Sequence, residues 1–325
     1  MSTQAYVAEK RYIVSKIKNG PYIETNNHSN LIYILFDYLL VMISITLSLH
    51  YKNPIVYVSS VIVISSRMRA LENLLHDASH RKLFKNPFLN TWIGMLCCAF
   101  PVFNSLYAYK ISHDKHHRYL GDSVSDPDRV RYDALGMKDA LKTPGAFIKK
   151  IISIMSLIEM PKFLLGTIKP FIFNRNTPKK EIIARVIFYI SLFFILTYFS
   201  VWKYFIFYWV FPYLTAFQLI RFLSEVSEHG NLYQNTHSIY KISRNNLCHP
   251  VLAFFLYPHS DNLHLLHHLL PHIPHYFLPQ LHHELMSDAI YAQGNHCYGY
   301  LFRRNKNTAT TISDLLSLRN KGNLC

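Results

Sequence analysis

The sequence predicts an all-α integral membrane protein. We expect about four transmembrane helices, further re-entrant or interfacial helices, and a cytoplasmic helical cap that carries clustered histidines. Three observations lead to this fold class. Apolar residues, 50% of the 325-residue chain, gather in a few long blocks. Basic residues gather in the stretches between these blocks. Within those basic stretches, histidines recur at the spacing of a helix face.

Four apolar blocks are long enough to cross a bilayer, which requires about 20 mainly apolar residues in a helix. We predict spans at about residues 31–50, 54–75, 184–202 and 204–222. The second span crosses fully only if its helix continues past the strictly apolar stretch, which ends at Ser66. Short turns around residues 51–53 and at Lys203 join the spans in two pairs.

The positive-inside rule gives the orientation. Lys52 and Lys203 are the basic residues of the two turns, and the rest of the 34 Lys and Arg residues lie on the other side. Both termini are therefore expected in the cytoplasm, and the net charge of +15 requires no nucleic acid partner. We expect a cytoplasmic N-terminal segment (1–30), a membrane domain (31–285) and a cytoplasmic C-terminal tail (286–325).

Two further apolar segments are not assigned as full spans. Residues 88–109 could cross once, but a single crossing would place the flanking sequences on opposite faces. We predict a re-entrant or interfacial hairpin around Pro101. Residues 148–173 mix lysines with apolar residues and predict an interfacial helical segment broken at Pro161. The five cysteines include no C-x-x-C pair, so neither a disulfide framework nor a thiolate zinc site is expected.

Eight of the 19 histidines form three clusters with i,i+4 or i,i+3,i+4 spacing. Side chains with this spacing share one face of a helix, and imidazole suits zinc, copper, iron and nickel. The predicted topology places all three clusters on the cytoplasmic side, just outside the bilayer. The clustered residues are His76 and His80; His113, His116 and His117; and His264, His267 and His268.

An isolated histidine is more often a surface or core residue than a ligand. We assign the isolated residues His28, His50, His237, His249 and His296 in this way. The clusters require another explanation, because chance does not favour three helical repeats on one side of a membrane. A closed zinc site takes four ligands, so eight histidines fit two metal ions better. The spacing alone does not name the metal.

The three boxes, H-x3-H, H-x2-H-H and H-x2-H-H, resemble those of the membrane-bound fatty acid desaturase superfamily, in its acyl-lipid desaturase and carotenoid ketolase-like branch. The flanking residues add to the resemblance, which covers roughly residues 60–285. HDASHRKLFKNPFLNTWIG is similar to the first box with its trailing Asn-x3-Gly. HHRYLGDSVSDPD is similar to the second box, and PHSDNLHLLHHLLPHIPHYFLPQLH to the third with its Pro-rich tail.

The resemblance implies a non-haem di-iron centre, with two iron ions and O2 as co-substrate. A further metal ligand is implied at His229 in SEVSEHGNL, one helical turn after Glu225. The catalytic, iron-binding histidines implied by the boxes are His76, His80, His113, His116, His117, His264, His267 and His268.

Several residues beside these ligands are expected to support them. A metal-bound imidazole usually donates its second N–H to a carboxylate or carbonyl, and the carboxylate candidates are Asp77, Asp114, Glu225, Glu228 and Asp261. Asp126 and Asp128 are predicted to cap or anchor the loop after the second box. Around the third box we expect supporting or surface roles for His259, His272, His275, His282 and His283.

The implied activity is that of an O2-dependent oxidoreductase that introduces a double bond into a hydrocarbon chain carried by a lipid or an acyl carrier. The alternative is a di-iron hydroxylase or ketolase acting on a fatty acyl, alkane or carotenoid substrate. A histidine-rich transporter is disfavoured, because the boxes lie outside the spans.

The chain has no flavin or NAD fingerprint, no cysteine set for an iron–sulfur cluster and no fused cytochrome b5. A separate ferredoxin or cytochrome b5-type donor is therefore expected. The expected location is the bacterial inner membrane, or the endoplasmic reticulum in a eukaryote, with the active site in the cytoplasm.

Overall fold

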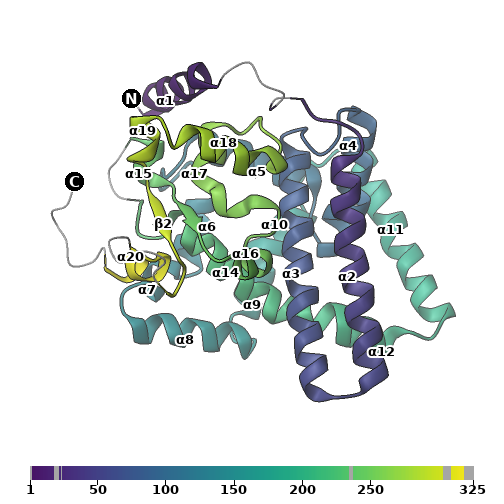
Figure 1. Cartoon of the computed structure of the whole chain (residues 1–325). Helices are drawn as coiled ribbons and strands as arrows, with labels where there is room; N and C mark the ends of the chain where they lie inside the picture. Colours follow the sequence, from purple (N-terminus) through teal and green to yellow (C-terminus); the bar gives the residue numbers. More distant parts are fainter. Residues whose placement is uncertain (1, 18–21, 23, 234–236, 303–308, 318–325) are drawn as a thin grey trace. The chain divides into compact units, whose positions relative to one another are not determined.

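The computed structural model describes residues 2–17, 22, 24–233, 237–302 and 309–317 (Figure 1). These residues are mostly helical, and the strands among them are two short ones, which confirms the all-α fold class. The chain forms two compact units. The membrane unit comprises residues 25–111 and 153–221, and the histidine unit comprises residues 1–24, 112–152 and 222–325.

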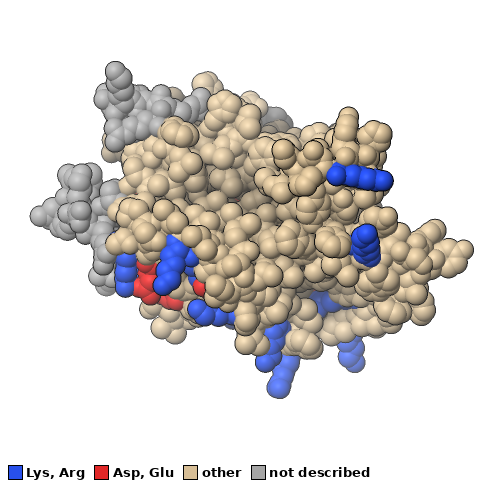
Figure 2. Space-filling view, turned by 90° about the horizontal axis from the view of Figure 1, so that it is seen from below, with Lys and Arg blue, Asp and Glu red and all other residues tan. Residues whose placement is uncertain are grey.

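Among the described residues, four helical segments are long and apolar enough to cross a membrane, or five if one bent pair is counted as a span. The four are α2 (Ser29–Tyr51), α3 (Pro54–Ser79), α11 (Lys179–Tyr198) and the run Trp202–His229. Large apolar side chains such as Ile32, Leu35 and Phe194 are exposed on these helices, as expected of residues that face lipid. In the face seen in Figure 2, uncharged residues cover most of the surface and charged side chains are scattered. These features indicate a membrane protein.

Helices α2 and α3 form an antiparallel pair joined by a tight turn (Figure 1). Lys52 adopts a left-handed conformation after α2, and the Asn53 side chain accepts a hydrogen bond from the backbone N–H of Ile55. Pro54 follows in the first turn of α3, where the missing N–H has no helical partner to lose. Further along the pair, the Ser60 hydroxyl donates to the Ser44 carbonyl at 2.8 Å.

A buried ion pair links α2 to α3 inside the apolar segments. Arg67 Nη1 lies 2.9 Å from Asp37 Oδ1, and the two side chains are 2% and 1% exposed. Ionisable groups within membrane spans are costly and usually pair with one another. Each charge therefore depends on the other to remain buried.

The fourth span is irregular along its length. Its elements are α12 (Trp202–Phe205), the π-helical turn η5 (Ile206–Val210), α13 (Phe211–Leu214) and α14 (Ala216–His229). The π-helical turn ends just before Pro212, and the backbone breaks at Thr215 with φ −114° and ψ −93°. The turn that precedes this span lies at residues 199–201, where Ser200 has a left-handed φ of 55°. Lys203, where we predicted the turn, lies inside α12.

The segment predicted as a hairpin is bent by 90° rather than straight. Its first arm comprises α4 (Pro87–Ile93), the π-helical η2 (Gly94–Ala99) and the 3-10 helix η3 (Phe100–Val102). Its second arm is α5 (Leu106–Arg118). The bend follows Pro101 by two residues, at Phe103, which has a left-handed φ of 54°. The Trp209 indole N–H donates to the Pro101 carbonyl at 2.8 Å, so this irregular backbone is satisfied by a side chain.

The predicted interfacial segment is also helical and broken. Its elements are α8 (Pro144–Met155), α9 (Met160–Phe163), the π-helical η4 (Leu164–Ile168) and α10 (Lys169–Ile172). The break lies at residues 156–159, with Leu157 in a left-handed conformation, and not at Pro161. Pro161 occupies the first turn of α9, where proline is tolerated.

The histidine unit consists of short elements around one apolar core. Leu265, Leu266 and Leu269 of the third box pack with Ile13 and Leu281. The predicted C-terminal tail contributes the second strand of a two-stranded parallel sheet. The elements besides the ends of α5, α8 and α14 are α1 (Ser2–Lys16), α6 (Pro127–Ala134), α7 (Met137–Ala140), α15 (Ile239–Ile242), β1 (Asn245–Leu247), α16 (Pro250–Leu256), η6 (Pro258–Leu263), α17 (His264–Leu269), η7 (His275–Phe277), α18 (Leu278–Leu285), α19 (Ala289–Ala292), β2 (His296–Tyr298) and α20 (Thr311–Ser317).

Replacing Asp37 by alanine should destabilise the membrane unit strongly, because it leaves the Arg67 guanidinium buried without its counter-charge. We expect a loss of about 3–5 kcal/mol in the free energy of unfolding. Thermal unfolding of the detergent-purified protein measures it. The matched control is Leu39→Ala on the same helix, whose side chain is 56% exposed. The double variant Asp37→Leu/Arg67→Met should recover most of the lost free energy of unfolding. Equal thermal unfolding midpoints for Asp37→Ala and Leu39→Ala would contradict the prediction.

Candidate metal centre

The three histidine boxes lie on helices, as their spacing predicts. The first box is at the end of α3, with His80 as its C-terminal cap, and belongs to the membrane unit. The second box is on the last turns of α5, and the third forms α17; both belong to the histidine unit. The structure therefore places six of the eight box histidines, and also His229 at the end of α14, in one unit.

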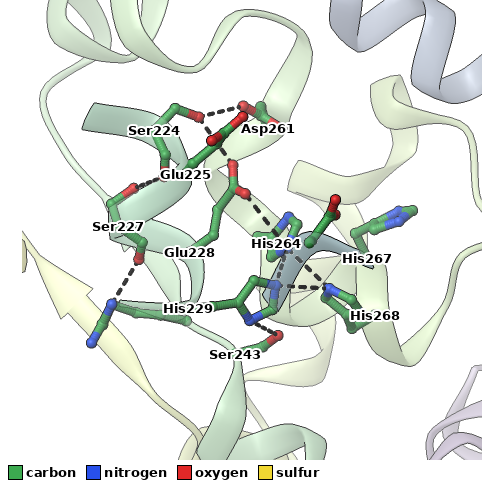
Figure 3. Close-up of polar contacts among 12 residues, drawn as sticks. Ser224, Glu225, Ser227, Glu228, His229, Ser243, Asp261, His264, His267 and His268 are labelled. Carbon is green, nitrogen blue, oxygen red and sulfur yellow. Dashed lines mark hydrogen bonds and ion pairs between the residues drawn. The ribbon is translucent and has the colours of Figure 1, made fainter. Parts of the chain in front are cut away.

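Four buried histidines converge through their Nε2 atoms, and we call them the four-histidine cluster: His116, His229, His264 and His268. The Nε2 of His264 lies 2.8 Å from that of His229 and 3.0 Å from that of His268. The Nε2 of His268 lies 3.2 Å from those of His116 and His229. Figure 3 shows the rings of His229, His264 and His268 pointing toward one another. These separations match those of imidazoles that bind one cation at roughly 2.1 Å.

The outer nitrogens of two cluster members determine where their protons lie. His116 Nδ1 is 2.9 Å from the Asp126 carboxylate, and His229 Nδ1 is 2.8 Å from the Ile242 carbonyl. Because both partners only accept, each Nδ1 carries a proton. Burial lowers the pKa of His229 to about 3, so this neutral ring directs an Nε2 lone pair into the cluster. Burial also opposes the charged form of His116, but Asp126 and Asp128 outweigh it and raise the pKa of His116 to about 9. A cation in the cluster would take the place of the His116 Nε2 proton and accept the lone pairs of its neighbours, so the residues fit a metal ion.

Burial favours the neutral form of two cluster members, His229 and His268. His268 is 1% exposed, and burial, followed by the neighbouring His264, lowers the pKa of His268 well below its usual range. A metal ligand must be deprotonated, and a histidine that stays neutral at physiological pH does not have to lose a proton to bind. His229 and His268 can therefore bind a cation without losing a proton, whereas His116 releases one when it binds.

Asp126 is fixed from several directions, which makes it a rigid acceptor for His116. Its Oδ2 accepts the backbone N–H of Gly121 at 2.7 Å, and its Oδ1 caps α6 through the N–H of Asp128 at 2.9 Å. Gly121 has a left-handed φ of +77°, which strains any residue that carries a Cβ, so glycine is favoured there. Burial opposes ionisation of Asp126, but His116 and the Gly121 N–H outweigh it and lower the pKa of Asp126.

A second group in the same unit, the three-histidine cluster, consists of His113, His117 and His267. The Nε2 of His117 lies 2.9 Å from the Nε2 of His113 and 2.9 Å from that of His267. His76 and His80 form a separate pair in the membrane unit, with ring centroids 4.9 Å apart and the rings edge to face. That His76 and His80 bind iron stays a prediction.

The predicted carboxylates differ in their contacts. Glu228 Oε2 lies 3.8 Å from His264 Nε2, and the Ser224 hydroxyl links Glu228 to Asp261 at 3.0 and 3.1 Å (Figure 3). Glu225 pairs instead with Arg131 at 2.9 Å. Asp77 Oδ1 is 3.7 Å from His76 Nδ1, which is too long for a hydrogen bond.

The two groups that contact the outer nitrogens of His116 and His229 were not predicted in that role. Asp126 was predicted only to anchor its loop, which it does as the cap of α6. The Ile242 carbonyl has no sequence signal, since any residue supplies a carbonyl. For Asp126 a sequence signal was available. The chain can turn back at Gly121, which lies between His116 and Asp126, and so bring the carboxylate of Asp126 toward His116.

The remaining histidines near the third box have other contacts. His282 Nδ1 lies 2.8 Å from the Tyr291 hydroxyl, and His249 caps α16. The His259 and His275 rings contact each other at 4.9 Å between centroids. Among the described residues, none of these four joins a group of potential metal ligands.

Comparison with known proteins identifies the family of the chain. It is 29% identical over 309 residues to a dihydrorhizobitoxine desaturase from Bradyrhizobium elkanii, a match that covers 92% of this chain and 87% of that protein. The sequence model of the fatty acid desaturase family matches residues 52–300, which include all three histidine boxes. The chain therefore belongs to the fatty acid desaturase family.

Proposed function

We propose that this protein is an O2-dependent di-iron desaturase that introduces a double bond into an acyl chain carried by a lipid or an acyl carrier. One observation carries the proposal: four buried imidazole Nε2 atoms converge in a chain of the desaturase family, and each lies 2.8–3.2 Å from at least one other.

The proposed ligands divide into two sets. One iron is held by the four-histidine cluster. The other is held by the three-histidine cluster together with His76 and His80, which we assign from their place in the first box of the family. Imidazole is a suitable ligand for iron. The three-histidine cluster, whose members lie on α5 and α17 like three members of the four-histidine cluster, supports a second ion.

When bound, the iron pair supplies the O2-derived oxidant that removes hydrogen from an unactivated methylene. The residues of the chain prepare this site without taking part in bond making. Asp126 and the Ile242 carbonyl hold the protons of His116 and His229 at Nδ1, so that both Nε2 lone pairs stay available. The burial of all four histidines excludes water that would otherwise quench the oxidant.

An external electron donor follows from the balance of the reaction. Desaturation removes two hydrogens and supplies two of the four electrons that reduce O2 to water. A separate donor of the ferredoxin or cytochrome b5 type must supply the other two. The net charge of +15 would attract an acidic carrier. We place both termini and the metal centre on the cytoplasmic side, in a bacterial inner membrane or in the endoplasmic reticulum.

The substrate and the type of reaction are proposals at a finer level than the family. The similar protein from Bradyrhizobium elkanii is named as a desaturase of dihydrorhizobitoxine. That name favours double-bond formation over hydroxylation or ketolation for this chain. The family name favours an acyl substrate.

Expression in a desaturase-deficient host should produce a new unsaturated fatty acid, because the protein supplies the missing oxidation. Gas chromatography–mass spectrometry of total lipid fatty acids measures the product and the position of its double bond. The His267→Ala variant should lose it, since His267 Nε2 lies in the three-histidine cluster. His249→Ala, on the exposed cap of α16, is the matched control and should retain the product. A hydroxylated or ketolated lipid in place of the alkene would sink the desaturase proposal and establish the alternative activity.

Replacing Asp126 by asparagine should weaken iron binding by roughly 10–100-fold, because the acceptor for His116 loses its charge while the cap of α6 is kept. Iron per chain is measured after dialysis against increasing chelator concentrations. Asp122→Asn is the control, because Asp122 caps the adjacent turn through Val124 and Ser125 and contacts no histidine there. Equal iron retention in the two variants would contradict a role for Asp126 at the metal.

A further inference from the structure

The short segment from Ile242 to Asn246 contacts both of the peptide segments that present the four-histidine cluster. One is the end of α14, which carries His229. The other is the first turn of α17, which carries His264 and His268. This segment itself holds none of the proposed ligands.

Three residues of the segment bind the end of α14. The Ile242 carbonyl accepts from His229 Nδ1. Arg244 donates through Nη1 to the Ser227 carbonyl at 2.8 Å and through Nη2 to the Gly230 carbonyl at 3.2 Å. The carbonyls of a last helical turn have no partner within the helix, so the guanidinium supplies it. The Asn246 amide also donates to the Ser227 carbonyl, at 3.2 Å.

The same segment binds the start of α17. The Arg244 carbonyl accepts from the Leu265 N–H at 3.3 Å, and Asn245 Oδ1 accepts from the Leu266 N–H at 3.2 Å. N–H groups in the first turn of a helix also lack partners within it. These two bonds determine where α17 begins, and thereby the positions of His264 and His268.

The C-terminal part of the chain holds this segment in place. Strand β2 pairs with β1, with Asn245 opposite His296. Asp314 pairs with Arg244, and the Thr311 hydroxyl donates to Asn246 Oδ1 at 2.9 Å. Arg244, Asn245 and Asn246 are each 0% exposed, so their polar groups rely on these partners and not on water.

We propose that Arg244 and Asn245 are positioning residues of the metal centre and that α20 braces them. They hold His229 and the His264–His268 pair at the separation that binds one cation, so that iron retention at the four-histidine cluster depends on the C-terminal segment. This inference rests on the proposed function, because it presupposes that the cluster binds iron.

The test measures the release of iron from the full-length, purified protein. Iron per chain is followed over time in the presence of a chelator for Asn245→Ala and for the double variant Thr311→Val/Asp314→Asn. We expect one of two irons to leave roughly 10–100-fold faster than in the wild type, while the other leaves at the wild-type rate. The double variant leaves Arg244 and Asn245 in place, so it remains informative if Asn245→Ala does not fold.

The controls separate positioning from general stability. Asn295→Ala removes an amide that bonds the Lys241 carbonyl, and Ser287→Ala removes an exposed hydroxyl that bonds the Glu284 carbonyl, away from α20. Both should release iron at the wild-type rate. Thr311→Ser keeps the hydroxyl and should restore retention when it replaces Thr311→Val.

The outcomes of the test are distinct. Wild-type release from both variants, or equal acceleration for both irons with a lowered unfolding midpoint, would overturn the inference and leave the proposed function standing. A wild-type protein that binds no iron would overturn the proposed function and this inference with it.

Discussion

The arrangement of the histidine unit depends on one constraint, which is that two imidazole nitrogens in close contact require a proton or a cation between them. Acceptors at the outer nitrogens of His116 and His229, namely Asp126 and the Ile242 carbonyl, keep a proton on each Nδ1 and direct each Nε2 into the cluster. The rest of the unit serves to keep these acceptors fixed. Gly121 lets the backbone approach Asp126, and Arg244 joins the segment of Ile242 to the end of α14. A cation in the cluster would help to offset the cost of burying these polar groups.

The membrane unit is subject to the same rule on buried polar groups, but satisfies it without a metal. Asp37 and Arg67 neutralise each other between α2 and α3. The irregular backbone at Pro101 receives the Trp209 N–H, and Ser60 bonds across the helix pair to Ser44. In the apolar surroundings of the membrane unit, these polar groups thus bond to one another. In the histidine unit, the bonds at the outer imidazole nitrogens leave the Nε2 atoms directed into the four-histidine cluster.

The sequence predicted the features that have a local periodic signal. The four spans, the bent fifth segment and the helical boxes follow from runs of apolar residues and from i,i+4 spacing. The incorrect predictions concern residues that can either end a helix or lie within its first turn. Pro161 was predicted to break a helix but begins one, and Lys203 was predicted in a turn that ends two residues earlier. The contacts of Ile242 and Arg244 could not be predicted, because they are made with or through backbone atoms that carry no side-chain signal.

The spacing of the histidines in the second and third boxes explains how each box is divided between the two clusters. Residues i and i+4 of a helix are separated by about 40° around its axis, and i+3 lies on the other side of residue i by about 60°. In the second box the i,i+4 pair, His113 and His117, joins the three-histidine cluster, and His116 joins the other. In the third box the assignment is reversed, since the pair His264 and His268 joins the four-histidine cluster and His267 the three-histidine cluster. Each H-x2-H-H box therefore contributes to both clusters, and a single metal ion could not use all of its histidines. The repeat of this box in the sequence is a reason to expect two ions, independent of the identity of the metal.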